Sequence, residues 1–472
     1  MALLRRTVFM TLLGLGMAPV PPLQAQSTPE GTWSGTLSLP TGGTLPLVFH
    51  VEASGDGYTA TWDSPAQGAV GIPATAVRVD GASLLLEMGN VGAGFEGTLS
   101  ADGATLEGMF RQGGAALPLT LTRGPASVPA RPQEPSAPFP YRVEEVRIAN
   151  DEAGVVLAGT LTLPPGSGPF PGAVLVSGSG PQNRDEELMG HKPFLVLADH
   201  LTRQGIAVLR YDDRGVAEST GDFGAATSED LASDALAALR HLGSHAEIDA
   251  GRVGIVGHSE GGMIAPMVAR DSDTPAYLVL LAGTGLKGLD IIRLQSDLIG
   301  RAGGASDAML AVNERAMDRA AAILRAHADP AAAEPLLRAV FEDAAAEAGA
   351  NADPATVRQQ VDAQVRQVNT PWFRFFLEYD PVPALEATTV PVLALNGSLD
   401  LQVPASENLA AIDAALTRGG NRDHVVRELP GLNHLFQEAR TGAPSEYATI
   451  EQTMSPVVLA AVSDWINERF GR

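Results

Sequence analysis

The stretch Gly257-His258-Ser259-Glu260-Gly261 lies between an apolar run, Val253 to Val256, and a helix-compatible segment, Met263 to Arg270. It matches the pattern Gly-x-Ser-x-Gly, in which a serine occupies a sharp strand-to-helix turn and exposes its hydroxyl at the edge of a sheet. The pattern alone is weak, because a Gly-rich turn before an ordinary helix matches it equally well. Its position between a strand and a helix predicts Ser259 as a nucleophile.

A serine nucleophile needs a histidine to remove its proton and a carboxylate to hold that histidine in one tautomer. Asp400 follows the apolar run 392–395 and the turn 396–398, so it lies just beyond the carboxyl end of an expected strand. His434 lies in the loop 430–434, after the last expected strand. The order Ser259, Asp400, His434 is the order expected for a nucleophile on such a turn.

Other acids and histidines are weaker candidates. Asp413 falls inside a helical pattern and Asp423 lies beside a strand start, whereas Asp400 is in a loop. His424 would project from a strand, and the ring of His258, next to the nucleophile, would point away from its hydroxyl. Asp400 and His434 are therefore the predicted acid and base.

An acyl-transfer intermediate also needs preorganised N–H donors for its oxyanion. The residue after the nucleophile, Glu260, is expected to supply one backbone N–H. The second is expected from the loop 177–181, Ser-Gly-Ser-Gly-Pro, which follows the apolar run 173–176. Within it Ser179 is the first choice and Gly180 the next, with a plain glycine turn as the alternative.

Composition limits the classes of function. The 472-residue chain is 45% hydrophobic and 18% charged, which predicts a globular protein with two or three structural units. It contains no cysteine, so disulfides, thiolate metal sites and a catalytic thiol are excluded. A formal net charge of −23 opposes binding to nucleic acid and anionic lipid, and favours neutral or cationic small-molecule partners.

The amino terminus has the pattern of an export signal. Arg5 and Arg6 precede an uncharged, mostly apolar run, 7–23, and a small-residue cleavage point follows Ala25. Residues 1–25 are therefore expected to be a removed signal peptide, by the general or the twin-arginine route. No later apolar run is long enough to span a bilayer, so we expect a periplasmic or secreted protein with no membrane span.

The sequence pattern changes twice along the rest of the chain. Residues 30–123 alternate short β-prone runs with Gly-containing turns, which predicts an antiparallel barrel or sandwich. A Pro-rich stretch, 124–140, predicts an extended linker. From residue 141 to 472, apolar strands alternate with amphipathic helices, which predicts a mostly parallel α/β sheet covered on both faces. The expected strands include 155–163 and 424–429, and a helix is expected at 451–469.

An Ala-rich helical insertion at about 284–380, with expected helices at 308–328 and 331–348, should either cap the sheet's carboxyl edge or be a plain packing subdomain.

Several motifs together carry a family resemblance: 177–185 (SGSGPQNRD), 210–215 (RYDDRG) with Ser219, the turn at Ser259, 396–400 (NGSLD) and Asn433-His434. Over residues 141–472 the chain resembles the α/β-hydrolase superfamily, and within it bacterial serine esterases and serine aminopeptidase-like hydrolases. The resemblance implies an eight-stranded fold, a helical cap, no cofactor and no metal. The chain departs from it at Ser177, where relatives often have His, and at Ala217, where glycine is common.

The resulting hypothesis is an exported carboxylic ester hydrolase, acting on a small-molecule ester through an acyl-enzyme at Ser259. One alternative is a serine peptidase or aminopeptidase acting on small peptides. A carboxylate cluster in the insertion, Glu342, Asp343 and Glu347, would then bind an amine terminus, although these residues suit a solvated helix face equally well. The weaker alternative is a non-catalytic binding protein on a hydrolase fold.

Overall fold

The computed structural model describes residues 28–38, 44–55, 57–64, 69–112, 115–125, 130–349 and 354–471. The expected signal peptide, residues 1–25, lies outside the described residues. The amino-terminal domain contains β1 (Gly31–Ser38), β2 (Thr44–Ser54), β3 (Gly57–Ser64), β4 (Ala69–Pro73), β5 (Ala76–Asp80), β6 (Ser83–Met88), β7 (Ala93–Leu99), β8 (Thr105–Gln112) and β9 (Ala115–Arg123). The second sheet contains β10 (Arg142–Asn150), β11 (Val155–Leu163), β12 (Phe170–Val176), β13 (Ala207–Tyr211), β14 (Ile248–His258), β15 (Leu278–Leu281), β16 (Val392–Gly397) and β17 (His424–Leu429).

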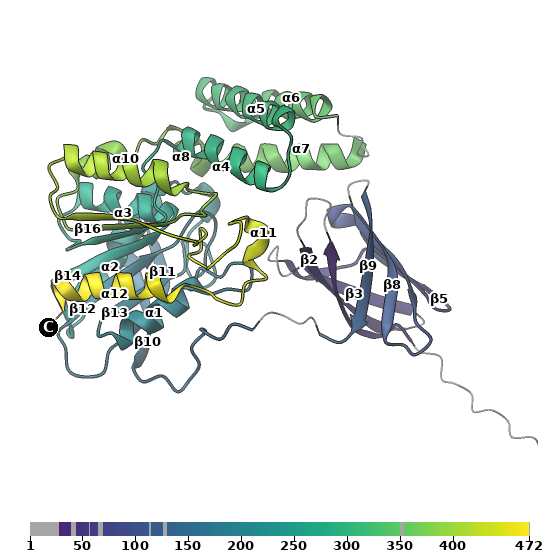
Figure 1. Ribbon diagram of the computed structural model, residues 1–472, viewed down its shortest axis with the longest axis horizontal. Helices are drawn as coiled ribbons and strands as arrows, with labels where there is room; N and C mark the ends of the chain where they lie inside the picture. Colours follow the sequence, from purple (N-terminus) through teal and green to yellow (C-terminus); the bar gives the residue numbers. More distant parts are fainter. Residues whose placement is uncertain are drawn as a thin grey trace, which may run out of the picture.

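In the described part of the chain the α-helices follow the linker, and most of those outside the insertion lie between strands of the second sheet (Figure 1). They are α1 (Pro193–Arg203), α2 (Ser228–Gly243), α3 (Glu260–Asp271), α4 (Gly288–Ala302), α5 (Asp307–Ala326), α6 (Pro330–Glu347), α7 (Pro354–Val368), α8 (Pro371–Glu378), α9 (Val382–Ala387), α10 (Ala405–Arg418), α11 (Pro444–Tyr447) and α12 (Pro456–Phe470). No helix in the described ranges is both long and apolar enough to cross a bilayer.

The second sheet has the mostly parallel order expected from the sequence. Over the described residues its eight strands run β10-β11-β13-β12-β14-β15-β16-β17. The strand β11 is antiparallel to both β10 and β13, and every pair from β13 to β17 is parallel. The carboxyl ends of β12, β14, β16 and β17 therefore meet at one edge, where such sheets bind ligands.

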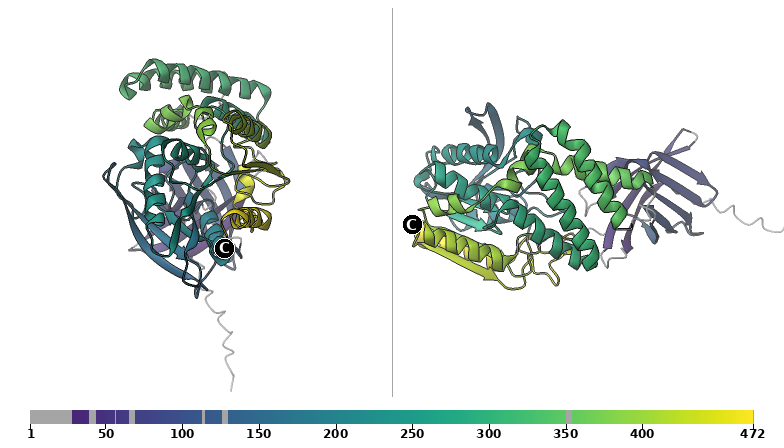
Figure 2. Two further views of the ribbon diagram at one scale, coloured as in Figure 1. Left: turned by 90° about the vertical axis from the view of Figure 1, so that its left-hand side faces the viewer. Right: turned by 90° about the horizontal axis from the view of Figure 1, so that it is seen from above.

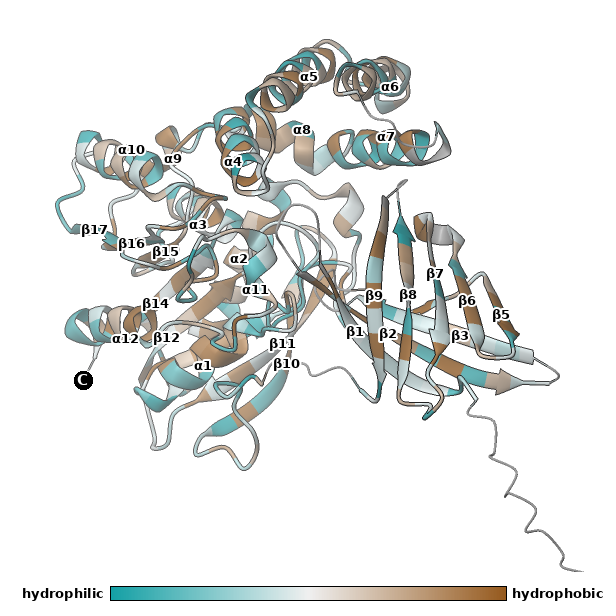
Figure 3. Ribbon diagram, turned by 45° about the vertical axis from the view of Figure 1, so that its right-hand side comes forward, coloured by the Kyte–Doolittle hydropathy of each residue, from teal (hydrophilic) through white to brown (hydrophobic). Residues whose placement is uncertain are grey.

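Helices cover both faces of this sheet with apolar side chains, and its central strands are therefore buried. On one face, side chains of α2, α3 and α10 pack against the strands, as Leu239, Ile264 and Ile412 illustrate. On the other, α1 and α12 contribute Leu197 and Val462. Figure 2 shows the helices on either side of the sheet, and Figure 3 shows the apolar colouring of its central strands.

The amino-terminal domain is an antiparallel sheet with its own core. In the described part of this domain the strand order is β4-β3-β2-β1-β9-β8-β7-β6-β5, and β1 closes on β9 through Trp33 and Ser34. The two outermost strands, β4 and β5, are neighbours in the chain, so the sheet curls into the barrel-like shape seen in Figure 1. Its interior is filled by Trp33, Phe49 and Phe95 among others. The short strand β4 was not predicted, because its sequence, AVGIP, has a glycine and a terminal proline.

The Pro-rich linker is partly anchored to the second domain. The Arg131 guanidinium donates to the carbonyls of Gly190, Ala448 and Ile450, at 2.9, 2.9 and 2.7 Å. The Gln133 amide bonds to the backbone of Thr453 and Met454. An extended linker leaves its polar groups available for such contacts, and here they join segments that flank the carboxyl edge of the sheet.

The insertion is more helical than the sequence indicated. The expected helices 308–328 and 331–348 are α5 and α6, and α4, α7 and α8 accompany them. Small residues such as Ala320 and Ala333 let these helices pack closely around Leu337 and Phe373. A second apolar cluster, Met263, Ile291 and Phe376, joins α4 and α8 to α3. The insertion therefore rests on the helix that follows the Ser259 turn.

Candidate active site

Ser259 occupies a strained turn between β14 and α3. Its φ and ψ are 53° and −114°, a conformation that costs a non-glycine residue about 1–3 kcal/mol. Glycines on either side permit the turn, since a Cβ on Gly257 would lie 2.0 Å from the Gly261 carbonyl oxygen. A Cβ on Gly261 would lie 2.1 Å from the carbonyl oxygen of Val176 in β12. The Gly-x-Ser-x-Gly pattern is thus required by backbone packing at this point.

The predicted acid and base form a buried hydrogen-bonded pair. The Asp400 Oδ2 and His434 Nδ1 atoms are 2.8 Å apart, and the residues are 3% and 4% exposed. The other carboxylate oxygen of Asp400 accepts from the backbone N–H groups of Gln402 and Val403, both at 2.8 Å. This arrangement fixes the carboxylate and leaves Nε2 of His434 as the ring nitrogen available for a proton transfer.

His258 links the serine turn to the histidine loop. Its Nε2 lies 3.0 Å from the carbonyl oxygen of His434, and the two rings are 4.8 Å apart. Its Nδ1 lies 2.9 Å from Glu186 Oε1, which also accepts from the backbone N–H of Gly178 at 2.7 Å. Burial alone would lower the pKa of His258, but the charge and hydrogen bond of Glu186 raise it above the ordinary value. A protonated His258 can donate from both ring nitrogens and so hold three loops together.

The two predicted oxyanion donors lie at the same pocket as the serine. Ser179, Ser259 and Glu260 all line it, whereas Gly180, the second choice, is not among the lining residues. Glu260 is the first residue of α3, so its N–H has no acceptor within the helix and is available to a ligand. The backbone N–H of Gly178 donates to Glu186, and Ser179 is the residue of this loop that lines the pocket.

The pocket is small, and helices of the insertion form much of its wall. Ile291 and Ile292 of α4 and Trp372 and Phe376 of α8 face it, together with Gln402 beside Asp400. Its volume is about 80 Å³. Because one water needs about 10–15 Å³ of such space, the pocket has room for about five to eight atoms of that size. The insertion thus lies over the carboxyl edge of the sheet.

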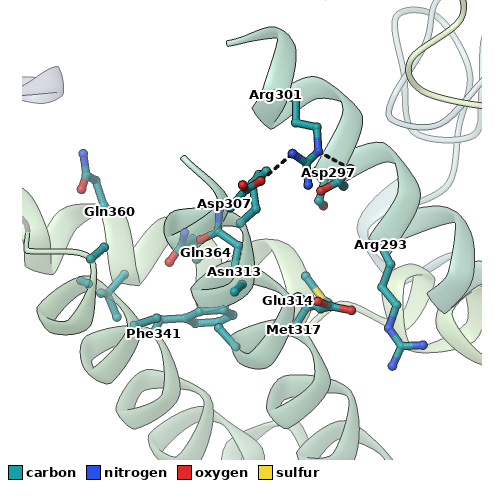
Figure 4. A pocket seen from close by; sticks show the side chains of 18 of the residues that line it. Arg293, Asp297, Arg301, Asp307, Asn313, Glu314, Met317, Phe341, Gln360 and Gln364 are labelled. Carbon is teal, nitrogen blue, oxygen red and sulfur yellow. Dashed lines mark hydrogen bonds and ion pairs between the residues drawn. The ribbon is translucent and has the colours of Figure 1, made fainter. Parts of the chain in front are cut away.

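A larger cavity lies within the insertion itself (Figure 4). It measures about 710 Å³ and is lined by residues of α4, α5, α6 and α7, including Phe341, Gln360 and Gln364. None of its lining residues lines the Ser259 pocket. Its charged residues partly neutralise one another, since Arg301 pairs with both Asp297 and Asp307. Size alone therefore does not make it the reaction site.

The candidate amine-binding cluster of the insertion lies elsewhere. Asp343 pairs with Arg319 and Glu347 with Arg315, all on the exposed faces of α5 and α6. Neither acid lines the Ser259 pocket, nor does Glu342. These positions agree with the alternative that the three acids belong to a solvated helix face.

A buried acid supports the loop that carries Ser179. The Ser177 hydroxyl and the Gln182 N–H both donate to the Asp213 carboxyl, at 3.1 and 3.0 Å. Burial, with smaller contributions from the charges of Glu260 and Glu186, raises the pKa of Asp213 to about 8. The carboxyl is therefore largely neutral at neutral pH, which avoids a negative charge beneath the oxyanion loop.

The neighbouring Arg214 and Ala217 have local roles. The Arg214 guanidinium pairs with Asp234 at 2.7 Å, so it braces α2 and does not reach the pocket. Ala217 has a φ of 45°, a left-handed conformation that glycine adopts at lower cost. This conformation explains why glycine is common at the matching position of the proteins that the chain resembles.

Two residues at the site were not predicted from the sequence. Glu186 directly follows the motif 177–185, and Trp372 lies in an aromatic run, 371–376 (PWFRFF), but neither pattern indicates a contact with the Ser259 turn. They reach the site through the loop after β12 and through α8, so only the tertiary structure brings them there. Among the described residues, no cluster of three or more His, Asp or Glu could hold a metal ion.

The strand order, the strained serine turn and the Asp400–His434 pair define an α/β hydrolase. The family model described as X-Pro dipeptidyl-peptidase (S15 family) matches residues 114–425, more than half of the chain. The chain therefore belongs to this family, within the α/β-hydrolase superfamily, as its motifs indicated. Its coarse activity is that of a hydrolase.

Individual proteins match this chain over a shorter region than the family model does, or at low sequence identity. Esterase EstD of Thermotoga maritima is 38% identical over 124 residues, which cover 26% of this chain and 30% of that esterase. The matched region thus spans less than a third of the curated relative. Among solved structures, the α/β hydrolase GrgF from Penicillium sp. sh18 is 15% identical, with a TM-score of 0.44 over 70% of this chain and all of that one. The Pyrococcus furiosus esterase Pf2001 is 13% identical, with a TM-score of 0.42 over 70% and 92%.

The buried Asp213 predicts a pH-dependent difference in stability. A folded-state pKa of about 8 lies above the unfolded value of 3.8, so the folded protein binds this proton more tightly. The resulting stabilisation is complete below about pH 4 and is lost as the pH rises towards 8. The variant Asp213→Asn has no ionisable group at this position. As the pH rises across this window, the free energy of unfolding of the variant should therefore increase relative to that of the wild type, by up to several kcal/mol.

Urea unfolding of both proteins at several pH values measures this difference. The control is Asp151→Asn, the same change at an exposed turn residue. A difference between Asp213→Asn and the wild type that stays constant with pH would contradict the buried, neutral state of Asp213.

Proposed function

We propose that this protein is an exported serine hydrolase that cleaves short-chain carboxylic esters through an acyl-enzyme. The observation that carries the proposal is the Asp400–His434 pair beside a pocket lined by Ser259, Ser179 and Glu260. In the proposed reaction Ser259 attacks the acyl carbon while His434 accepts its proton. The N–H groups of Ser179 and Glu260 stabilise the oxyanion, and Asp400 stabilises the protonated imidazole. His434 then protonates the leaving alcohol, and water releases the acid by the same steps.

The size of the pocket supports a short acyl group. The apolar side chains of Ile291, Ile292 and Phe376 favour an alkyl chain, and the space of about 80 Å³ limits its length. Residues of α4 and α8 line the pocket, so we expect a long chain to displace one of these helices.

Hydrolysis of ethyl esters of graded acyl length tests this proposal. We expect kcat/KM to be highest from acetate to butyrate and to fall for hexanoate and octanoate, because the pocket holds about five to eight water-sized atoms. Ser259→Ala should lower kcat by roughly four to six orders of magnitude for every ester, while leaving the thermal unfolding profile intact. Fluorophosphonate labelling should occur in the wild type and be absent in Ser259→Ala. Turnover by a clean Ser259→Ala preparation would rule the mechanism out.

A second candidate function is dipeptide release, which the match to the X-Pro dipeptidyl-peptidase family favours. The pocket argues against it, because an Xaa-Pro acyl group contains a peptide bond and two side chains and exceeds this space. Alanyl-prolyl 4-nitroanilide and 4-nitrophenyl acetate should be compared at equal enzyme concentration. We expect the ester to be cleaved with the higher kcat/KM, and faster anilide cleavage would favour the peptidase.

Export is supported by the sequence of the amino terminus. Arg5 and Arg6, the apolar run 7–23 and the small residues before position 26 have the order of a signal peptide. We expect the full-length chain, expressed in a Gram-negative host, to yield a periplasmic or secreted product that begins at Gln26. Intact-mass measurement of the fractionated protein checks this, and an uncleaved chain confined to the cytoplasm would contradict it.

A further inference from the structure

Glu186 places a buried carboxylate beside the ring of His258, although its position is unfavourable in two respects. The residue is 2% exposed, and burying a carboxylate is costly unless a partner compensates its charge. Its φ of 51° lies in the left-handed region, which a non-glycine residue adopts only at a cost in free energy. Residues held in such backbone conformations cluster at functional sites. The Glu186–His258 pair is therefore a candidate for a role in the reaction.

The ring of His258 has a hydrogen-bond acceptor at each of its nitrogen atoms. Its Nδ1 lies 2.9 Å from Glu186 Oε1, and its Nε2 lies 3.0 Å from the carbonyl oxygen of His434. A carboxylate and a carbonyl oxygen accept hydrogen bonds and donate none, and a neutral imidazole has one N–H. The ring therefore donates to both acceptors only when it is protonated. Loss of the proton leaves one of the two acceptors without its donor.

The two contacts hold the segments that flank the nucleophile. Glu186 Oε1 also accepts from the backbone N–H of Gly178 at 2.7 Å, so the pair fixes the residue before Ser179, the proposed oxyanion donor. Gly178 lies against the nucleophile, since a Cβ on it would be 3.1 Å from the Cβ of Ser259. The carbonyl of His434 belongs to the proposed base itself. Neither member of the pair lines the pocket, so the pair acts on the positions of other residues and does not touch the substrate.

Titratable groups face His258 from the loops packed against it. Glu186 lies in the loop after β12, Asp400 in the loop after β16, and His434 in the loop after β17, with its ring 4.8 Å away. Burial lowers the pKa of His258, but the charge and hydrogen bond of Glu186, with smaller contributions from the other two residues, raise it above the ordinary value of 6.5. Asp213 lies near enough to Glu186 to be affected by its charge, and its own pKa is about 8.

We propose that Glu186 and His258 are positioning residues of this site, and that the proton on His258 makes turnover depend on pH. The inference rests on the proposed ester hydrolysis and assigns a regulation of that same site. While the ring is charged, the pair holds the oxyanion loop and the His434 loop in line with Ser259. When the ring loses its proton at alkaline pH, one segment is released and kcat falls, because a misplacement of about 1 Å can lower a rate about 100-fold. KM changes little, because the pair does not touch the substrate.

The pH dependence of kcat for ethyl butyrate, from about pH 6 to about pH 9, tests the proposal. Glu186→Gln removes the charge that holds the proton on His258, so burial prevails. The alkaline fall in kcat should therefore move to lower pH by about one unit or more. At the pH optimum of the wild type, kcat of the variant should be lower by about tenfold or more, with KM within about threefold of the wild-type value.

Matched variants separate this role from a general effect on folding. Glu187→Gln makes the same change at the exposed neighbouring residue and should leave kcat, KM and the pH profile unchanged. His258→Gln has no ionisable ring, so its kcat should be low at every pH, without the alkaline fall. Asp213→Asn should retain the fall, because the proton that is lost belongs to His258. A Glu186→Gln profile that differs from the wild type only in scale, or a fall that disappears in Asp213→Asn, overturns the proposal.

A measurement on the wild type covers the case in which the variants do not fold. In protein with nitrogen-15-labelled histidine, the NMR signals of one buried ring should show both nitrogens protonated above pH 7. This ring should lose a proton over the pH range in which kcat falls. The absence of such a ring overturns the proposal without any variant.

Fluorophosphonate labelling of Ser259 separates failure of the proposal from failure of the proposed ester hydrolysis. Its rate depends on the same alignment but not on ester turnover, so it should show the same shift with pH in Glu186→Gln. If the wild type is labelled but cleaves no ester, the ester hydrolysis fails while the positioning role stands. If esters are cleaved but neither labelling nor kcat shifts with pH in Glu186→Gln, the positioning role fails instead.

Discussion

The close backbone contact between β12, β14 and α3 is the constraint on which the rest of this site depends. Gly257, Gly261 and the Val176 carbonyl approach so closely that any side chain on either glycine would collide with backbone. This contact forces Ser259 into its strained conformation and directs the start of α3 at the pocket. The strain, about 1–3 kcal/mol, is offset by the buried packing of α3 against the sheet. The strained turn at Ser259 and an unpaired backbone N–H at Glu260 therefore arise from one feature of the fold.

Most buried acids around this turn have hydrogen-bond or ion-pair partners that compensate their burial. Asp400 has His434 and two backbone donors, and Glu186 has His258 and the Gly178 N–H. Burial keeps Asp213 largely protonated, which its raised pKa expresses. One carboxylate oxygen of Glu186 and one of Glu260 are buried without a hydrogen-bond partner within the described residues.

Local sequence signals were sufficient for most elements that carry the machinery. The strands β11 and β17 have the expected limits, and the others that flank the site differ by a few residues, because apolar runs bounded by polar turns are strong signals. Ser259, Asp400 and His434 were predicted because each follows an expected strand on one sheet edge, and the structure brings Asp400 and His434 into hydrogen-bond contact. The insertion was harder, because α4, α7 and α8 were not predicted individually. The helix α7 alternates Val and Ala with Gln and charged residues, a pattern typical of many exposed helices, and α8 has only eight residues. The helix expected at 451–469 begins at Pro456, because Ser455 caps it and proline fits its first turn.

The sequence by itself determined the order of the main strands and helices and the turn at Ser259, because these depend on local periodicity and on glycines at fixed spacing. The acid and base proposed here were predicted in the same way, from their positions after strands. Tertiary structure alone decided what surrounds them. Glu186 reaches His258 across 72 residues of chain and Trp372 reaches Glu260 across 112. Such contacts depend on how whole helices and loops pack. Local sequence periodicity does not indicate which side chains meet at that separation along the chain. The size of the pocket and the unpaired oxygen of Glu260 are consequences of that packing.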